Sequence, residues 1–174
     1  MRVVKVMASS CITIAIMVAI FLFSAQSGGE SGSSSESVAR VLASIFVDGF
    51  DGMAPDVQAS IIAQMSWPIR KTAHATEYAI LAASLVITCW QVIAWRRERK
   101  ARDYSPEQRI TRVGAIAFAI AVFYACTDEI HQLFIDGRAG QVTDVLVDAS
   151  GAAVGCVLCC AIIYAFLRRR RARA

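Results

Sequence analysis

The stretch at residues 70–94, RKTAHATEYAILAASLVITCWQVIA, decides the fold of this chain. From residue 73 onward it is mostly apolar and long enough to cross a hydrocarbon core of roughly 30 Å, which takes about twenty helical residues. Its first two turns also carry three polar residues at helical spacing, Lys71, His74 and Glu77, so that they share one helix face. The stretch therefore predicts a membrane-spanning helix with a polar site at one end.

Three further apolar stretches predict membrane-spanning helices at residues 6–23, 113–132 and 142–167. The chain of 174 residues is 56% hydrophobic, more than an ordinary soluble domain. We predict an all-α fold, a polytopic membrane bundle of about four transmembrane helices in a single domain at residues 1–174. Residues 6–23 also follow Arg2 and Lys5 and precede small residues, as in a cleaved signal peptide, but their length favours a retained span.

Basic residues are distributed unevenly around these spans. Of the 18 Lys and Arg, 14 lie before the first span, in the loop at residues 95–112 or after residue 167. By the positive-inside rule, both termini and this loop are cytoplasmic in a multi-pass plasma-membrane protein. The polar site then faces outward, together with 11 of the 14 acidic residues. The basic loops lack interleaved aromatic residues, so we expect contact with anionic membrane lipids and no binding of nucleic acid.

Residues 24–70 form the predicted outer segment. Residues 24–37 are almost entirely small and polar, which indicates a flexible linker. Apolar residues then recur at helical spacing at 38–46 and 57–65, and residues 48–52 separate the two runs. We expect two short amphipathic helices that lie on the outer membrane surface and pack against lipid. A lid over the polar site is the alternative.

All six cysteines lie within the predicted spans. The outer segment has none, which excludes a disulfide-stapled exterior domain. Cys156, Cys159 and Cys160 resemble a metal-binding spacing, but no partner ligands accompany them on the same helix. We therefore expect these residues to serve small-residue helix packing.

The polar residues of the four spans fall at one depth. Counting about twenty residues from each cytoplasmic end reaches Ala25, Thr76, Gln132 and Asp148. On each helix the polar side chains share one face, except that Glu129 lies about 100° around from its neighbours. The faces carry Lys71, His74, Glu77 and Tyr78 on one helix, Tyr124, Asp128, His131 and Gln132 on the next, and Asp144, Asp148, Gly151 and Gly155 on the last. We expect these groups to surround one cavity.

Charged side chains inside hydrocarbon are costly, about 2.5 to 3.5 kcal/mol each at a helix centre. Contact with lipid headgroups accounts for Arg70, Asp136 or Asp144 near the boundary, whereas Asp128 and Glu129 fall inside it. A functional site explains the cluster better than a structural polar network, which stays the alternative.

Four separated motifs follow one another along the chain. They are FSAQS at 23–27, RKTAHATEY at 70–78, DEIHQLF at 128–134 followed by Gly137 and Arg138, and DVLVD at 144–148 followed by Gly151 and Gly155. On these motifs the chain resembles the VanZ-like family over residues 23–155. Two positions depart from the family's pattern, because Asp136 stands where a proline is expected and Asp148 where asparagine is common.

The resemblance implies a small bacterial membrane protein of the cell envelope. The family's namesake accompanies glycopeptide-resistance genes and lowers susceptibility to teicoplanin, without a settled biochemical mechanism. The positions that match the family's motifs are Gln26, Lys71, His74, Glu77, Tyr78, Asp128, Glu129, His131, Gln132, Arg138, Asp144 and Asp148.

Two functions fit these residues. In the first, the site acts on an anionic lipid or a lipid-linked cell-wall precursor, where histidines move protons and a carboxylate orients a histidine or holds a metal. The predicted catalytic residues are His74, Glu77, Asp128, Glu129 and His131, and the predicted substrate-binding residues are Gln26, Arg70, Lys71, Tyr78, Gln132, Arg138, Asp144 and Asp148. In the second, the same cluster binds a lipid or an envelope partner without turnover, as a shield, modulator or assembly factor. The chain has no HExxH zinc motif, and its metal content and cofactors stay open.

The charge distribution predicts how the chain is oriented in the membrane. A membrane-impermeant thiol reagent applied outside should label an engineered cysteine at Ser33 and should not label one at Arg99. The parent chain, with its six native cysteines, gives the background. Labelling at Arg99 but not at Ser33 would invert the orientation and move the polar site to the cytoplasmic side.

Overall fold

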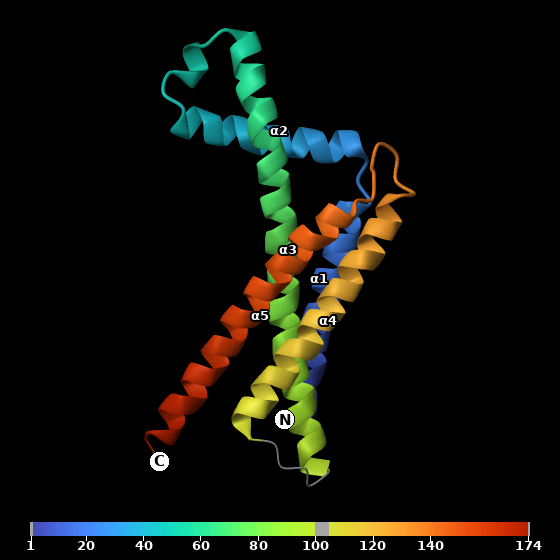
Figure 1. The fold of residues 1–174 in the computed structure, drawn as a ribbon, viewed down its shortest axis with the longest axis vertical. Coiled ribbons are helices and arrows are strands. Elements are labelled where there is room, and N and C mark those ends of the chain that lie inside the picture. Colours follow the sequence, from blue (N-terminus) through green and yellow to red (C-terminus); the bar gives the residue numbers. More distant parts are fainter. Residues whose placement is uncertain (1, 100–104, 174) are drawn as a thin grey trace.

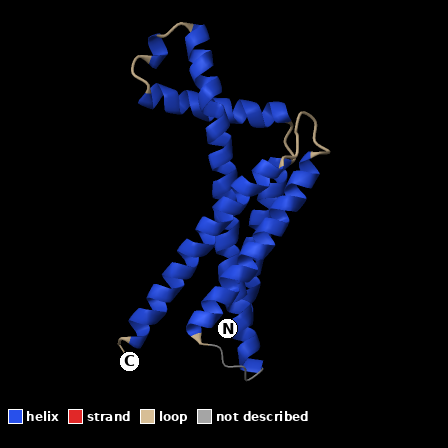
Figure 2. Ribbon diagram, viewed as in Figure 1, coloured by secondary structure: helices blue, strands red, loops and turns tan. Residues whose placement is uncertain are grey.

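The chain folds into helices joined by short connections. In a computed structural model, residues 2–99 and 105–173 are described; they form five α-helices and one 3-10 turn, and contain no strand (Figures 1 and 2). The elements are α1 (Arg2–Ser24), α2 (Gly28–Phe46), η1 (Phe50–Gly52), α3 (Pro55–Arg99), α4 (Pro106–Gln132) and α5 (Val142–Arg171). The predicted all-α fold is confirmed. Residues 100–104 of the predicted cytoplasmic loop lie outside the described residues.

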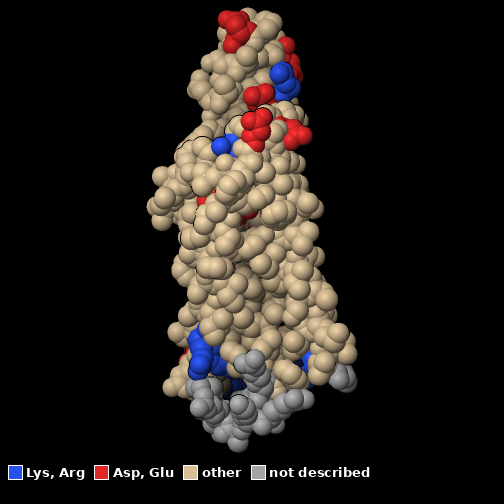
Figure 3. Space-filling model, turned by 90° about the vertical axis from the view of Figure 1, so that its right-hand side faces the viewer, with Lys and Arg blue, Asp and Glu red and all other residues tan. Residues whose placement is uncertain are grey.

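Four of the helices are long and apolar enough to cross a membrane. They are Arg2–Ser24, Pro55–Trp95, Pro106–Gln132 and Val142–Arg171, which contain the four predicted spans. On the face in Figure 3, Lys and Arg gather at one end, acidic side chains lie mostly toward the other, and a long band between them is mainly uncharged. We call the two ends the basic end and the polar end. Both termini lie at the basic end (Figure 1), as an even number of spans requires.

Helix α3 is the centre of the bundle, and α5 crosses it at very close range. A Cβ atom added to Gly151 would lie 1.9 Å from the carbonyl oxygen of Ala75, and one added to Gly155 would lie 2.1 Å from that of Ala79. Only glycine permits two helix backbones to approach this closely. These two glycines therefore allow α5 to pack directly against the backbone of α3.

Small side chains also bring α4 close to its neighbours. Val113, Ala117, Ala121 and Ala125 recur every fourth residue along one face of α4, and all are fully buried. Side chains at this spacing line one helix stripe, so small ones let the facing helices pack at short distance.

The cysteines of α5 pack against the backbones of both neighbouring helices. The Cys156 thiol donates to the carbonyl of Gly114 at 3.8 Å, and that of Cys159 donates to the carbonyl of Ala83 at 3.7 Å. These contacts confirm the prediction that the cysteines serve helix packing.

Polar contacts inside the bundle hold α1 against α3 and α4. The hydroxyls of Thr13 and Thr88 are 3.0 Å apart, and the Tyr124 hydroxyl donates to the carbonyl of Met17 at 2.7 Å. Both contacts lie within the spans, where no bulk water competes for the same groups. They fix how α1 is aligned with the other helices.

The predicted flexible linker at residues 24–37 is wrong, because α2 begins at Gly28. Ser27 caps this helix: its hydroxyl accepts from the N–H of Glu30 at 3.3 Å, and the Glu30 carboxylate accepts from the N–H of Ser27 at 2.9 Å. This reciprocal pair is a capping box, and the hydrogen bonds from Ser27 lower the pKa of Glu30. The serines that follow bond carbonyls of their own helix, as Ser35 does with Ser31 at 2.9 Å. A serine-rich sequence is thereby accommodated in a helix.

The second predicted outer helix is not separate. Residues 57–65 form the beginning of α3, which continues through Pro68 without a break to Arg99. Ala39 and Ala43 of α2 are fully buried in a small cluster with Ile62 and Phe50. This packing stabilises the start of α3, although proline within a helix removes one backbone hydrogen bond. The predicted break between the two apolar runs is confirmed, with Gly49 in the left-handed conformation at φ 72°.

The crossing of α3 and α5 generates a stability prediction. Gly151→Ala should destabilise the folded chain by about 1 to 3 kcal/mol or more, because the new methyl group meets the rigid backbone of α3. Gly29→Ala is the matched control on α2, since a Cβ atom there has nothing within 4 Å. Thermal unfolding in detergent should show a clear loss for the first variant only, and equal melting of both would disprove the close crossing.

Candidate functional site

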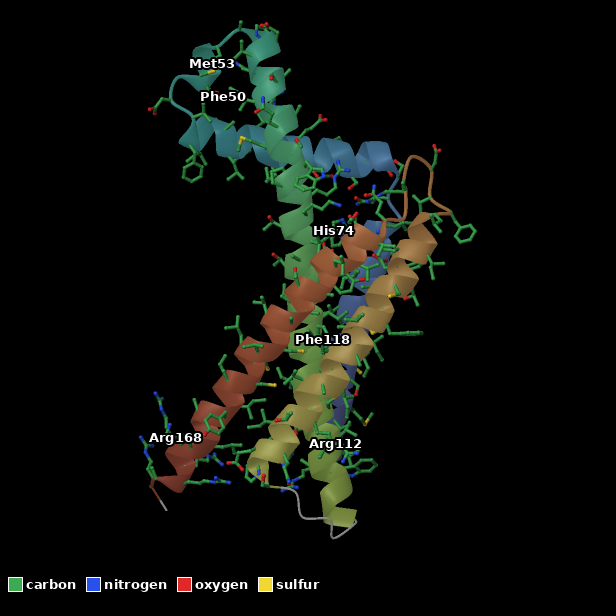
Figure 4. All side chains as sticks on the ribbon, in the orientation of Figure 1. Phe50, Met53, His74, Arg112, Phe118 and Arg168 are labelled. Carbon is green, nitrogen blue, oxygen red and sulfur yellow. The ribbon has the colours of Figure 1, made fainter. Side chains whose placement is uncertain are left out.

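The polar end gathers side chains from three helices and one loop. Figure 4 shows His74 on α3 beside the first turns of α5. His74 lies within electrostatic range of Arg138 in the loop at 133–141, of Asp128 on α4 and of Asp144 on α5. Residues far apart in the sequence are thus brought together, although their assignment as a functional site stays a prediction.

Asp128 is the hydrogen-bonding centre of this cluster. Its side chain is 3% exposed, and its Oδ2 accepts from the Ser24 hydroxyl at 2.7 Å and from the Gln132 amide at 3.3 Å. The contact with Ser24 joins the end of α1 to the end of α4 across the core. Asp128 therefore holds the helix ends together, whatever other role it has.

Glu129 connects α4 to the start of α5. One of its oxygens accepts from the backbone N–H of Gln141 at 2.8 Å, and the other accepts from the Gln132 amide at 3.4 Å. Gln141 is the N-cap residue of α5, and its own side chain makes no capping hydrogen bond. Glu129 thus satisfies a backbone donor at a helix beginning, where donors would otherwise lack partners.

The loop at 133–141 is attached to the turn between α1 and α2. The N–H of Gly28 donates to the carbonyl of Asp136 at 3.0 Å, and a Cβ atom at Gly28 would lie 2.0 Å from the carbonyl oxygen of Gly137. The Arg138 guanidinium donates through Nε to the carbonyl of Gln26 at 3.1 Å. Gln26 therefore positions Arg138 through its backbone.

Two arginines at the polar end lie within electrostatic range of one another. The Nε of Arg70 donates to the Ser35 hydroxyl at 3.5 Å. Burial lowers the pKa of Arg138, and the neighbouring charge of Arg70 lowers it further. Arg138 also lies within electrostatic range of Asp128, Glu129 and Asp144, but no carboxylate forms a direct ion pair with either guanidinium group in the described residues.

Lys71 has a different environment from the two arginines. Its ammonium forms a salt bridge with Asp144, and it lies 5.8 Å from the ring centroid of Trp67. This pair links α3 to α5 one helical turn before Ala75 on α3 and about two turns before Gly151 on α5. Lys71 and Asp144 largely neutralise each other, so both contribute to helix pairing.

Asp148 and Tyr78 are buried without polar partners. Asp148 is 1% exposed, and neither of its oxygens has a hydrogen-bond partner among the described residues. The same holds for the hydroxyl of Tyr78, which is fully buried, and for Oδ1 of Asp128. Asp148 also lies within electrostatic range of Glu77, Asp128 and Glu129. The interior of the polar end is therefore rich in hydrogen-bond acceptors.

Glu77 links this interior to an open groove. The groove has a volume of about 620 Å³ and lies between α2 and α3. Its lining is mostly apolar and consists of Leu42, Pro68, Ile69, Thr72, Ala73, Thr76 and Glu77. The hydroxyls of Thr72 and Thr76 donate to carbonyls of their own helix. Glu77 is the ionisable side chain among the lining residues.

His131 lies on the side of the cluster nearest α1. Its ring stacks on Phe21, with 4.4 Å between centroids, and its Nδ1 is buried without a partner in the described part of the chain. No hydrogen bond joins either histidine to a carboxylate within residues 2–99 and 105–173. The same residues contain no group of three or more His, Cys, Asp or Glu side chains placed to hold a metal ion.

Comparison with known proteins identifies the family of this chain. The sequence model of the family described as VanZ/LLP1 matches residues 10–165, which include all the motifs of the polar end. The chain belongs to the VanZ/LLP1 family. No match was found among curated proteins or among solved structures.

The contact between Ser24 and Asp128 was not predicted from the sequence of this VanZ/LLP1 chain. Ser24 lies in the FSAQS motif and is the last residue of α1. The signal was this position at the polar boundary of the span, where a hydroxyl can reach the ends of the other helices.

This contact predicts that Ser24→Ala reduces stability. Removal of the hydroxyl leaves a buried carboxylate oxygen with one weaker partner, which costs about 1 to 3 kcal/mol. Ser44→Ala is the control, because the Ser44 hydroxyl is exposed and bonds only its own helix.

A double-mutant cycle of Ser24→Ala with Asp128→Asn, followed by thermal unfolding in detergent, measures the coupling between the two side chains. Strictly additive effects would show that the hydrogen bond contributes nothing.

Proposed function

We propose that the polar end binds the anionic headgroup of an envelope lipid or of a lipid-linked cell-wall component. The observation that carries this proposal is the pair Arg70 and Arg138, which lie within electrostatic range of one another and form no ion pair with a described side chain. Arginine recognises phosphate and carboxylate through several N–H groups at once. Nε is engaged in each arginine, and the terminal nitrogens remain for a ligand.

The groove beside the arginines supports a lipid rather than a small soluble anion. It is lined mainly by apolar side chains between α2 and α3, and it begins next to the backbone segment that carries Arg70. An acyl chain in the groove would place its headgroup at the level of the two guanidinium groups. Apolar grooves with a few polar groups at one end are typical of amphiphile sites.

We also propose that this site faces outward from a bacterial plasma membrane, because most basic residues lie at the opposite end together with both termini (Figures 1 and 3). By the positive-inside rule, that end is cytoplasmic. An outward site meets lipids and precursors of the outer leaflet. An effect on glycopeptide susceptibility, which the family resemblance suggests, is then a second readout of the same binding.

Catalysis at the same site is the second candidate function. His74 favours it, because this half-buried imidazole lies within electrostatic range of both Arg138 and Asp128. A histidine beside an anion site can transfer a proton to a leaving oxygen. Turnover of extracted envelope lipids by the purified protein, lost in His74→Ala, would establish an enzyme. Retention of lipid without product would establish binding alone.

The arginine pair predicts the effect of two substitutions on lipid binding. Arg70→Gln and Arg138→Gln should each weaken binding of dioctanoyl phosphatidylglycerol about tenfold or more, because each removes a charge-assisted contact of about 1.5 to 3 kcal/mol. Binding is measured by native mass spectrometry on the full chain in a neutral detergent.

Arg40→Gln is the matched control for these variants. Arg40 is an exposed arginine on α2 for which no contact with the polar end is found among the described residues. Its substitution should leave binding unchanged. Equal binding by the parent and both site variants would contradict the proposed function.

A further inference from the structure

The interior below the arginine pair has more hydrogen-bond acceptors than donors. Both oxygens of Asp148, one oxygen of Asp128 and the hydroxyl oxygen of Tyr78 are buried without partners in the described part of the chain. Each of these three side chains is at least nine-tenths buried. A buried carboxylate is stable only when it is protonated or receives hydrogen bonds from a donor.

Three of the donors near this interior are already engaged. The ammonium of Lys71 is bound to Asp144, and the amide of Gln132 is shared between Asp128 and Glu129. The hydroxyl of Ser24 donates to the other oxygen of Asp128. The Tyr78 hydroxyl, which has no partner, can donate to only one of the three free carboxylate oxygens of Asp148 and Asp128, so the other oxygens need a further donor.

Glu77 is the residue at which the open groove meets this interior. This residue lines the open groove between α2 and α3 and lies within electrostatic range of both Asp128 and Asp148. Arg138, at the outer side of the cluster, is within the same range of Asp128 and Glu129. The anion site and the acceptor-rich site are thus in electrostatic range of one another, and Glu77 is the member of the second that lines the groove.

We propose that the ligand is zwitterionic and carries a primary ammonium group as well as an anion, as an aminophospholipid does. This inference rests on the proposed function, in which Arg70 and Arg138 hold the anion. The ammonium is held by Glu77 and Asp148, its N–H groups supply the donors that the buried acceptors lack, and an acyl chain occupies the apolar groove.

Three short-chain lipids that share a phosphodiester test this inference. Dioctanoyl phosphatidylethanolamine has a cation with N–H donors, dioctanoyl phosphatidylcholine has a cation without them, and dioctanoyl phosphatidylglycerol has no cation. Native mass spectrometry on the full chain in a neutral detergent should show phosphatidylethanolamine bound about tenfold or more tightly than the other two, the effect of a charge-assisted hydrogen bond. Soluble phosphoethanolamine, which lacks acyl chains, should bind much more weakly than the lipid.

Asp148→Asn and Glu77→Gln keep the shape of each side chain and remove its charge. Each should abolish the preference for phosphatidylethanolamine and leave the binding of phosphatidylglycerol unchanged. Arg138→Gln should weaken the binding of all three lipids to a similar extent. Glu36→Gln, at an exposed carboxylate of α2, is the matched control and should keep the preference.

The possible failures separate the two proposals. Equal binding of the three lipids by the parent chain would overturn the zwitterionic ligand and leave the anion site intact, and it would mean that Asp148 is buried in its protonated form. A preference that survives both Asp148→Asn and Glu77→Gln would also overturn it. Equal binding of soluble phosphoethanolamine and the lipid would overturn the role of the groove. Binding of none of these compounds would overturn the proposed function itself.

Discussion

The backbone contact between α3 and α5 is the constraint on which the rest of the structure depends. Gly151 and Gly155 lie against the carbonyls of Ala75 and Ala79, at distances that no side chain permits. Because the two helices touch here, Asp148, one turn before Gly151, is directed into the bundle rather than toward lipid. The polar cluster of this VanZ/LLP1 chain is therefore a consequence of glycine packing as much as of its own charges.

The sequence predicted the four membrane spans but not the structure of the outer segment. Apolar length alone determines where a helix can cross a membrane, so the four spans were predicted correctly. Helix α2 was missed because serine and glycine disfavour helix interiors, although Ser27 and Glu30 carried the pattern of a capping box. Continuity of α3 through Pro68 depends on its packing with α2, which no local pattern indicates.

The gathering of the polar residues followed from depth and helix faces, but their pairing did not. The helix faces set Lys71 apart from Arg70, but they do not indicate that Lys71 pairs with Asp144. That pair depends on how α3 packs against α5, a tertiary property. The contact of Ser24 with Asp128 was missed for the same reason, because it requires the end of α1 to meet α4.

The charged groups at the polar end are only partly paired with one another. The pairs already formed, such as Lys71 with Asp144, offset the cost of placing charge away from water. Arg138 and Asp148 lack such partners, yet each is held in place, Arg138 by the carbonyl of Gln26 and Asp148 by the glycine contact of its helix. Groups fixed in advance lose little conformational freedom when a ligand binds. Polar groups that are positioned but lack partners fit the proposed binding site better than a purely structural network, in which the groups would be paired with one another.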